Sequence, residues 1–353
     1  MLLLGNEAIS LGAIHAGISS SYGYPGTPST ESMEFLVEHF EKHKAPFAAW
    51  AVNEKTAFEQ ALGTCLVGRR ALVVMKHVGL NVAADPFMSA SLLGIHGGLV
   101  VEVADDPGMH SSQNEQDSRA YADFARIPCF EPATHQEAYD MTREAFDLSE
   151  RFGLPVMLRI VTRLAHARAS LAVKDPRSPN PIAKAPDPQS WVLVPMNARK
   201  QWKSLLSRTD EIQQYVSTSA HNPLTLSSDD RGVGVITSGI GRLYYEENLA
   251  ALGFKPSHLH IGAYPLPEAK LKELISRVSK LYVIEEGYSI IEDKLHALSY
   301  ARNPGIEVLG KRTGHLPLMG ELNPDLVAKA LGLSAHAHAA PSSFALPSRP
   351  PQL

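Results

Sequence analysis

Residues 71–88 read ALVVMKHVGLNVAADPFM, and the order of residue types in this segment indicates the fold class. The apolar, β-branched run at 71–76 predicts a strand that is covered on both faces. Lys76, His77 and Asn81 place polar groups where that strand ends. In open parallel sheets, ligands bind at the carboxyl ends of the strands. The segment therefore predicts an α/β fold with a candidate site at one edge of its sheet.

Similar runs lie on either side of this segment and extend the pattern over the first 165 residues. Helical segments between them repeat apolar residues every three to four positions, as in 57–66 and 137–151. This alternation of strands and helices favours a mostly parallel sheet. The predicted strands of the region are 19–23, 47–52, 71–76, 99–104 and 155–161.

The amino-acid composition changes after residue 173. Residues 174–230 begin rich in proline and polar side chains, and they predict a connector with one helix near 198–215. A second α/β domain is predicted over 231–333, and residues 334–353 have the composition of a disordered tail. The second domain is expected to have strands at 233–237, 258–263, 281–285 and 306–309, and helices that start near Arg242, Glu268 and Ile290.

Composition argues against several classes of protein. The 353 residues suffice for two domains, and a net charge of −4 gives no basic surface for nucleic acid. Cys65 and Cys129 lack Cys-x-x-Cys spacing, so they predict buried thiols rather than ligands of a cluster or of zinc. No apolar run approaches the roughly 20 residues of a membrane helix, and the N-terminus does not read as a signal peptide. We expect a cytoplasmic protein without a metal site of its own.

Polar residues follow four successive predicted strands, in the segments 24–30, 53–55, 76–81 and 105–119. Each segment alone also fits a plain structural role. Asn53 can cap a helix whose dipole Glu54 complements, and the aspartate pair at 105–106 suits either a metal or a simple turn. The carboxyl ends of parallel strands meet at one edge, so the convergence of four such segments predicts a binding site there.

Six blocks of the sequence, in order between about Gly5 and Leu331, resemble the alpha subunit of indolepyruvate ferredoxin oxidoreductases. That family belongs to the thiamine-diphosphate-dependent 2-oxoacid oxidoreductases. The blocks are long enough to be specific, and the resemblance covers nearly the whole chain. They read YPGTPST (24–30), NEKTAFEQALG (53–63), ALVVMKHVGLNVAADPFM (71–88), VEVADDPGMHSSQNEQDSR (101–119), LPVMLRIVTRLAH (154–166) and YVIEEGYSIIEDKL (282–295).

The resemblance implies a first domain, 1–173, that binds the pyrimidine ring of thiamine diphosphate, and a transketolase C-terminal-like domain at 231–333. Glu54 matches the glutamate that hydrogen-bonds the pyrimidine nitrogen. That hydrogen bond favours the imino tautomer, in which the cofactor's own amino group can remove the C2 proton. The other roles are also carried over by position. The matching residues are Glu54 and His77 as catalytic groups, Pro25, Gly26, Asn81 and again Glu54 as cofactor-binding groups, and Thr27 and Arg119 as substrate-binding groups.

The sequence also departs from the family. It contains neither a Gly-Asp-Gly motif for the diphosphate and Mg²⁺ nor cysteines for clusters, and we expect it to end before the diphosphate-binding domain. The resemblance therefore implies a hetero-oligomer. A partner subunit would hold the diphosphate and Mg²⁺, and iron–sulfur clusters with a gamma-type subunit would pass electrons to ferredoxin or another acceptor.

Together these parts would decarboxylate an aryl-type 2-oxoacid oxidatively, with coenzyme A taking the acyl group. Two alternatives remain open from the sequence. The chain could be a non-catalytic assembly or regulatory paralogue, which the absence of the diphosphate motif favours and the presence of Glu54 opposes. It could also belong to a thiamine enzyme that uses a flavin or nicotinamide partner as its electron acceptor.

Overall fold

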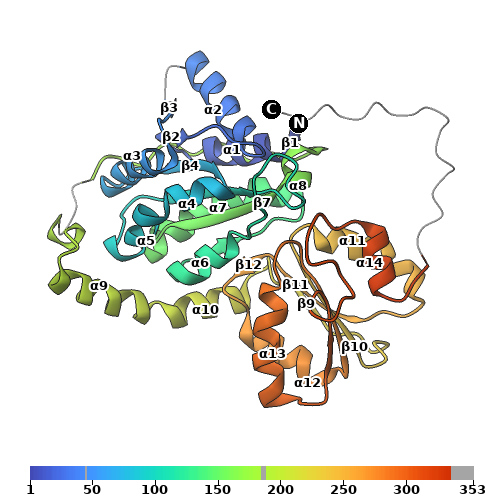
Figure 1. Ribbon diagram of the computed structural model, residues 1–353. Helices are drawn as coiled ribbons and strands as arrows, with labels where there is room; N and C mark the ends of the chain where they lie inside the picture. The colour runs from blue at the N-terminus through green and yellow to red at the C-terminus, as the bar shows by residue number, and fades with distance from the viewer. Residues whose placement is uncertain (44–45, 184–187, 335–353) are drawn as a thin grey trace, which may run out of the picture.

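A seven-stranded sheet forms the first part of the molecule (Figure 1), in a computed structural model that describes residues 1–43, 46–183 and 188–334. The predicted tail, apart from Ser334, lies outside the described residues. The strands run in the order β12-β6-β7-β5-β4-β2-β3, and all neighbours are parallel except β12 and β6. Their bounds are β2 (Ser20–Gly23), β3 (Phe47–Trp50), β4 (Ala71–Lys76), β5 (Leu99–Asp105), β6 (Cys129–Phe130), β7 (Val156–Val161) and β12 (Ala263–Tyr264).

All five strands predicted for this region are present, and β4 has its predicted bounds. Every residue of β4, β5 and β7 is buried, as their apolar runs predicted. The two-residue strand β6 was missed because so short a segment has no periodicity. A small antiparallel ribbon of β1 (Leu2–Leu4) and β8 (Arg168–Ser170) was missed as well.

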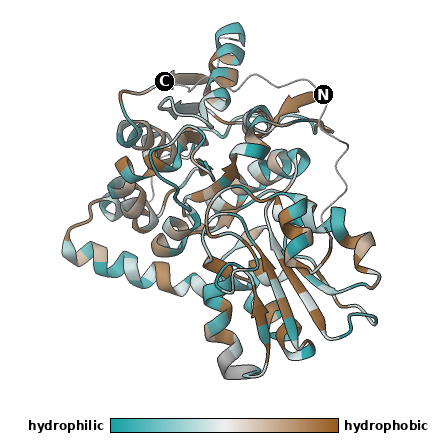
Figure 2. Cartoon of the chain, turned by 45° about the vertical axis from the view of Figure 1, so that its right-hand side comes forward, coloured by the Kyte–Doolittle hydropathy of each residue, from teal (hydrophilic) through white to brown (hydrophobic). Residues whose placement is uncertain are grey.

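Helices cover both faces of this sheet. In one layer α1 packs on α2 and α7, and in the other α3 packs on α4 and α5. Figure 2 shows the hydrophobic residues gathered along the strands and the hydrophilic ones along the outer helices. The helix bounds are α1 (Gly5–His15), α2 (Thr30–His43), α3 (Glu54–Leu66), α4 (His77–Val82), α5 (Ala84–Leu93), α6 (Arg119–Ala125), α7 (His135–Phe152) and α8 (Thr162–His166).

A second sheet of five strands, in the order β14-β13-β10-β11-β9, lies below the first in Figure 1. Only β9 is antiparallel to its neighbour. The helices predicted near Arg242, Glu268 and Ile290 are confirmed. The elements are β9 (Leu224–Thr225), β10 (Val233–Ser238), β11 (Ser257–Ile261), β13 (Lys280–Ile284), β14 (Glu307–Leu309), α11 (Gly241–Asn248), α12 (Glu268–Arg277), α13 (Ile290–Arg302) and α14 (Pro324–Ala330).

Two sequence predictions for this part were wrong in detail. The helix expected at 198–215 is two helices, α9 (Pro195–Ser207) and α10 (Thr209–Thr218), which meet at Arg208. The strand expected at 258–263 splits at Gly262, because β11 pairs with β10 in the second sheet whereas β12 pairs with β6 in the first. The chain therefore passes from one sheet to the other through a single glycine.

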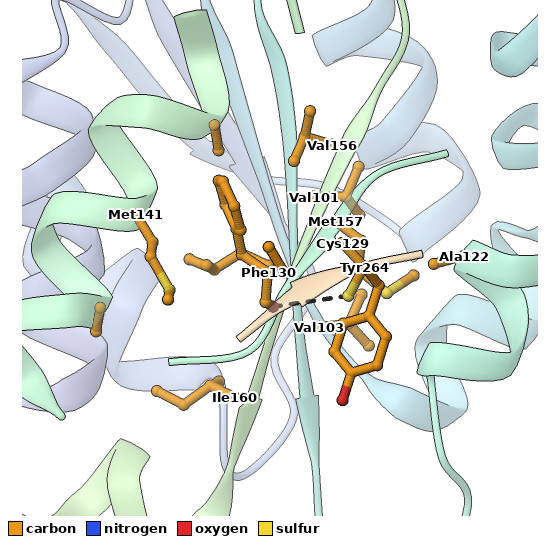
Figure 3. Close-up of a cluster of buried hydrophobic side chains, with 14 of the residues drawn as sticks. Val101, Val103, Ala122, Cys129, Phe130, Met141, Val156, Met157, Ile160 and Tyr264 are labelled. Atoms are coloured by element: carbon orange, nitrogen blue, oxygen red, sulfur yellow. Dashed lines mark hydrogen bonds between the residues drawn. The ribbon is translucent and has the colours of Figure 1, made fainter. Parts of the chain in front are cut away.

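The buried amide of Asn222 holds this crossing in place. Its Oδ1 accepts hydrogen bonds from the backbone amides of Gly262 and Ala263, each at 2.9 Å, and its Nδ2 donates to the Ala263 carbonyl. Figure 3 shows Tyr264, just beyond the crossing, among apolar side chains of the first sheet that include Val103 and Cys129. Because β12 comes from the region expected to form the second domain, the division at residue 231 stays a prediction.

A buried ionic network joins the two sheets around Arg159 in β7. The side chain of Arg159 is fully buried, and its Nε donates to Asp105 Oδ2 at 2.7 Å. Its other nitrogens bind Glu131 and, at 3.1 Å, the backbone carbonyl of Glu286 from the second sheet's side. Replacing one partner of a buried ion pair leaves an uncompensated charge, which is strongly destabilising.

No described helix combines the length and the apolar character that a membrane span requires.

Arg159→Met should lower the free energy of unfolding by about 3–5 kcal/mol, because Asp105 and Glu131 would remain buried without their cation. Urea denaturation monitored by circular dichroism measures this change. Arg151→Met is the matched control, since Arg151 forms a half-exposed pair with Glu211, and it should cost about 1 kcal/mol or less. Equal losses in the two variants would contradict a special role for the buried network.

Candidate functional site

The connections of the first sheet diverge at the neighbouring strands β2 and β4. From β2 the chain continues to β3 on one side, and from β4 it continues to β5 on the other side. In open parallel sheets ligands bind at such a point of divergence, outside the carboxyl ends of the strands. Two of the polar segments predicted from the sequence, 24–30 and 76–81, lie at the ends of these two strands, where the connections diverge.

The turn that follows β2 is fixed by its own hydrogen bonds. The amide of Gly26 donates to Thr30 Oγ1 at 2.9 Å, and the amide and hydroxyl of Ser29 both donate to the Gly26 carbonyl. A Cβ atom added to Gly26 would stand 2.8 Å from Lys76 Cδ, so the glycine lets the turn lie directly on the lysine side chain. Lys76 Nζ donates in turn to the Ser111 carbonyl at 2.9 Å. The turn is thereby held over the end of β4.

Glu54 is the first residue of α3, and its side chain lies against α4. Asn53 caps the helix as predicted, because its Oδ1 accepts a hydrogen bond from the Thr56 amide at 2.8 Å. Glu54 is only 8% exposed, and a Cβ atom on Gly79 would stand 2.5 Å from Glu54 Oε1. Within the described part of the chain, the Glu54 carboxyl group has neither a hydrogen-bond partner nor an ion-pair partner. The Glu54 oxygens are not among the fully buried side-chain atoms that lack a partner, so the carboxyl group reaches solvent and is available to a ligand.

His77 and Asn81 also lie on α4. His77 is buried, and its Nε2 is 3.1 Å from the Asn114 carbonyl, which makes Nε2 the protonated nitrogen. Its Nδ1 is buried without a partner in the described part of the chain, so the ring keeps one acceptor available. Asn81 is exposed at the end of the helix, where its Oδ1 accepts a hydrogen bond from the Tyr121 hydroxyl at 2.7 Å.

Thr27 lines a polar cavity of about 590 Å³ at the same edge. Two pairs of side chains line this cavity: His166 lies 3.3 Å from Glu31, and Arg163 forms an ion pair with Glu321 at 2.7 Å. The hydrogen bond from His166 lowers the pKa of Glu31 and so keeps that carboxyl group ionised. Arg163 and His166 were missed from the sequence, although they directly follow β7, another strand that ends at this edge.

Arg119 is buried and belongs to the ionic network around Arg159. Its Nε and Nη2 donate to the Asp117 carboxylate, Nη1 donates to the Tyr264 hydroxyl, and Nη2 also donates to the backbone carbonyls of Glu286 and Tyr288. Burial raises the pKa of Asp117, but Arg119 and Arg159 outweigh burial and hold that pKa at about 2. All three guanidinium nitrogens therefore have protein acceptors, and the predicted substrate contact of Arg119 stays a prediction.

Comparisons with known proteins agree on one family. The family model described as "Pyruvate flavodoxin/ferredoxin oxidoreductase, thiamine diP-bdg" matches residues 11–203. The chain is 41% identical over 343 residues to the indolepyruvate oxidoreductase subunit IorA of Archaeoglobus fulgidus, which covers 94% of this chain and 54% of that protein. The corresponding subunit of Methanothermobacter thermautotrophicus is 38% identical, over 100% of this chain and 58% of that protein. The chain thus spans about half the length of the curated relatives it matches.

Among solved structures, the chain is similar to a 2-oxoglutarate:ferredoxin oxidoreductase from Magnetococcus marinus. The TM-score is 0.72 at 16% identity, and the match covers 94% of this chain and 64% of that one. At this level of identity the likeness shows the fold alone. The comparisons confirm the resemblance that the six sequence blocks indicated and the predicted α/β fold class.

Glu102 makes the stability of the first sheet dependent on pH. It is fully buried in β5, one carboxyl oxygen accepts a hydrogen bond from the Ser32 hydroxyl at 2.6 Å, and the other has no partner in the described residues. Burial raises the pKa of Glu102 to about 8, from 4.5. A raised pKa in the folded state contributes stability that is complete below pH 4.5 and is lost as the pH rises towards 8.

Glu102→Gln should therefore remove part of the pH dependence of unfolding. Between pH 5 and 8 the wild-type chain should lose stability relative to the variant, by up to about 1.4 kcal/mol per pH unit for one proton. Urea denaturation of both proteins at pH 5, 6.5 and 8 measures the difference, and other titrating groups cancel in it. A difference that stays constant over this range would show that Glu102 does not hold its proton as described.

Proposed function

The chain belongs to the pyruvate flavodoxin/ferredoxin oxidoreductase family of thiamine-diphosphate-binding proteins, and on this premise we propose that it supplies the pyrimidine half of a thiamine diphosphate site. The observation that carries the proposal is the Glu54 carboxyl group, which lies at the predicted edge on a largely buried residue and has no partner in the described residues. A positioned carboxyl group is the donor that a pyrimidine ring nitrogen requires. The residues present therefore fit the group.

In this proposal each neighbouring residue has a distinct role. Glu54 holds a proton at the pyrimidine nitrogen, and Gly79 leaves the space in which the Glu54 carboxyl group lies. Pro25, Gly26 and Asn81 border the ring. Bound thiamine diphosphate supplies the electron sink for decarboxylation of a 2-oxoacid.

The proton acceptor at this edge is His77, whose Nδ1 has no described partner. Its tautomer is fixed by the Asn114 carbonyl, which orients the ring. Thr27 lines the polar cavity and would bind the substrate carboxylate through its hydroxyl group. Arg119 would bind the substrate only if one of its present hydrogen bonds, such as that to the Tyr264 hydroxyl, were replaced by a bond to the substrate. Without that exchange, Arg119 positions Tyr264 and the backbone at Glu286.

Exposed apolar side chains around this edge support a protein surface that covers it. Tyr24 follows β2, Trp50 ends β3, Val52 precedes α3 and Val82 ends α4, and all four are at least 38% exposed. Clustered exposed apolar groups mark interaction sites. We propose that the diphosphate-binding domain, with its Mg²⁺, docks here, either from a partner subunit or from elsewhere in the same polypeptide.

The complete complex would be a cytoplasmic hetero-oligomer. It would oxidise an aryl-type 2-oxoacid such as indolepyruvate, transfer the acyl group to coenzyme A and pass electrons through iron–sulfur clusters and a gamma-type subunit to ferredoxin. The two relatives described above are indolepyruvate oxidoreductase subunits, which supports the 2-oxoacid class. Those clusters would lie outside this chain, because Cys65 and Cys129 are both buried and unpaired, and burial raises the pKa of each thiol.

Thiamine diphosphate with Mg²⁺ should bind weakly to the chain alone and tightly once the co-purifying diphosphate-binding partner is added. Half of the contacts to the cofactor would then come from each side. Isothermal titration calorimetry on the chain, and then on the complex, measures both affinities. Tight binding to the chain alone would contradict a divided site, and absence of binding in both states would favour a non-catalytic assembly protein.

Glu54→Gln should reduce turnover of the assembled complex by about 100-fold or more, which is the usual contribution of a general acid–base group. The glutamine amide keeps the size of the side chain but cannot give a proton to the pyrimidine nitrogen or take one from it. Glu59→Gln on the exposed side of the same helix is the matched control and should leave turnover unchanged. Turnover of Glu54→Gln within about twofold of wild type would remove Glu54 from the mechanism.

A further inference from the structure

A second cavity of about 120 Å³ lies between α6, α10 and α13 and shares no lining residue with the cavity beside Thr27. Its walls are mostly apolar. A dry cavity of comparable size accommodates a single benzene ring. The apolar walls are formed by Ala122, Ile127, Ile212, Leu266 and Ile290.

The charged residues of this cavity are not equivalent. Lys294 is paired with Asp123, so their charges cancel. The guanidinium group of Arg126 lies 5.8 Å from the centre of the Trp202 ring, and in the described part of the chain it has no carboxylate partner and donates no hydrogen bond. A cation–π contact of this kind uses none of the guanidinium N–H groups as hydrogen-bond donors, so they can still bind an anion.

The backbone fixes Arg126 at the end of α6. Its φ angle of +58° is a left-handed conformation that L-residues other than asparagine and aspartate rarely adopt, and Arg126 ends α6 in that conformation. A residue in this conformation is a common way to end a helix, and the Arg126 amide donates to the carbonyls of Ala122 and Asp123. Arg126 is thereby held at the end of α6, where its side chain is exposed to solvent and lines the cavity.

We propose that this cavity binds a small apolar carboxylic acid, with its hydrocarbon body between α6, α10 and α13 and its carboxylate on Arg126. An apolar pocket with one convergent charged donor is the usual form of such a site. The hydrocarbon body supplies most of the binding energy, and the guanidinium group supplies orientation and selectivity for a charged ligand. This inference does not depend on the proposed thiamine diphosphate site.

Such a ligand would connect the two sheets. Ala122 and Arg126 belong to the segment around α6 of the first sheet, whereas Ile290 and Lys294 belong to α13 of the second. Arg119, which also lines the cavity, already binds Asp117 and Glu285 on opposite sides of this junction. A molecule that contacts both sides stabilises their arrangement, because it binds the folded chain and not the unfolded one.

The test uses phenylacetate as the probe and 2-phenylethanol as its uncharged counterpart. Titration calorimetry on the full chain should give a Kd of about 1 mM for phenylacetate, as expected for a ligand of this size. Because 2-phenylethanol lacks the carboxylate, it should bind at least about tenfold more weakly. Equal affinity for the two probes, or no phenylacetate binding at up to about 10 mM, would overturn the proposal.

Substitutions of single residues test whether phenylacetate binds in this cavity. Arg126→Gln should weaken phenylacetate binding about tenfold or more, whereas Arg199→Gln, at an exposed position on α9, should not change it. Thr209→Trp places a large ring at the exposed mouth of the cavity and should abolish binding without disturbing the core. Thr27→Val should leave the affinity unchanged. Loss of binding in Thr27→Val, or full binding in both Arg126→Gln and Thr209→Trp, would assign phenylacetate to another site and overturn the proposal.

Discussion

The charge of Arg159 inside the first sheet is the constraint on which much of the structure depends. A guanidinium group with no exposure to solvent is tolerated only where anions and carbonyls surround it. Asp105, from the neighbouring strand β5, and Glu131, from beyond β6, supply the anions, and Glu286 supplies a carbonyl. Because Glu286 follows β13 of the second sheet, satisfying one cation in the first sheet also fixes how the two sheets meet.

The same network orders the segment between β5 and α6, which shapes the candidate site. The Oδ2 atom of Asp105 accepts from both Arg159 and the Ser118 amide, so the end of this segment is tied to the network. Further along it, the Asn114 carbonyl sets the tautomer of His77, and Glu115 accepts from the amides of Gly108 and Gly320. A stabilising cluster deep in the protein therefore helps to position groups at the candidate site.

Much of the fold could be predicted from sequence because its strands are continuous apolar runs, as β4 and β5 illustrate. What failed depends on tertiary contacts. Nothing in the run 258–263 indicates that Gly262 separates two sheets, since that break is stabilised by Asn222, some forty residues away in the chain. Likewise LRIV at 158–161 looks like an ordinary strand, and the burial of its arginine follows only from partners at 105, 131 and 286.

The candidate site was predictable to a similar degree and for similar reasons. Asn53 and Glu54 lie where a strand end and a capping signal placed them, because both signals are local. The pairing of Arg163 with Glu321 joins residues 158 positions apart, so no local pattern contains it. Local signals thus identify which residues reach the edge, and long-range pairing decides which of them remain available. Glu54 has no described partner and remains available. Arg119 has an acceptor for every guanidinium nitrogen and does not.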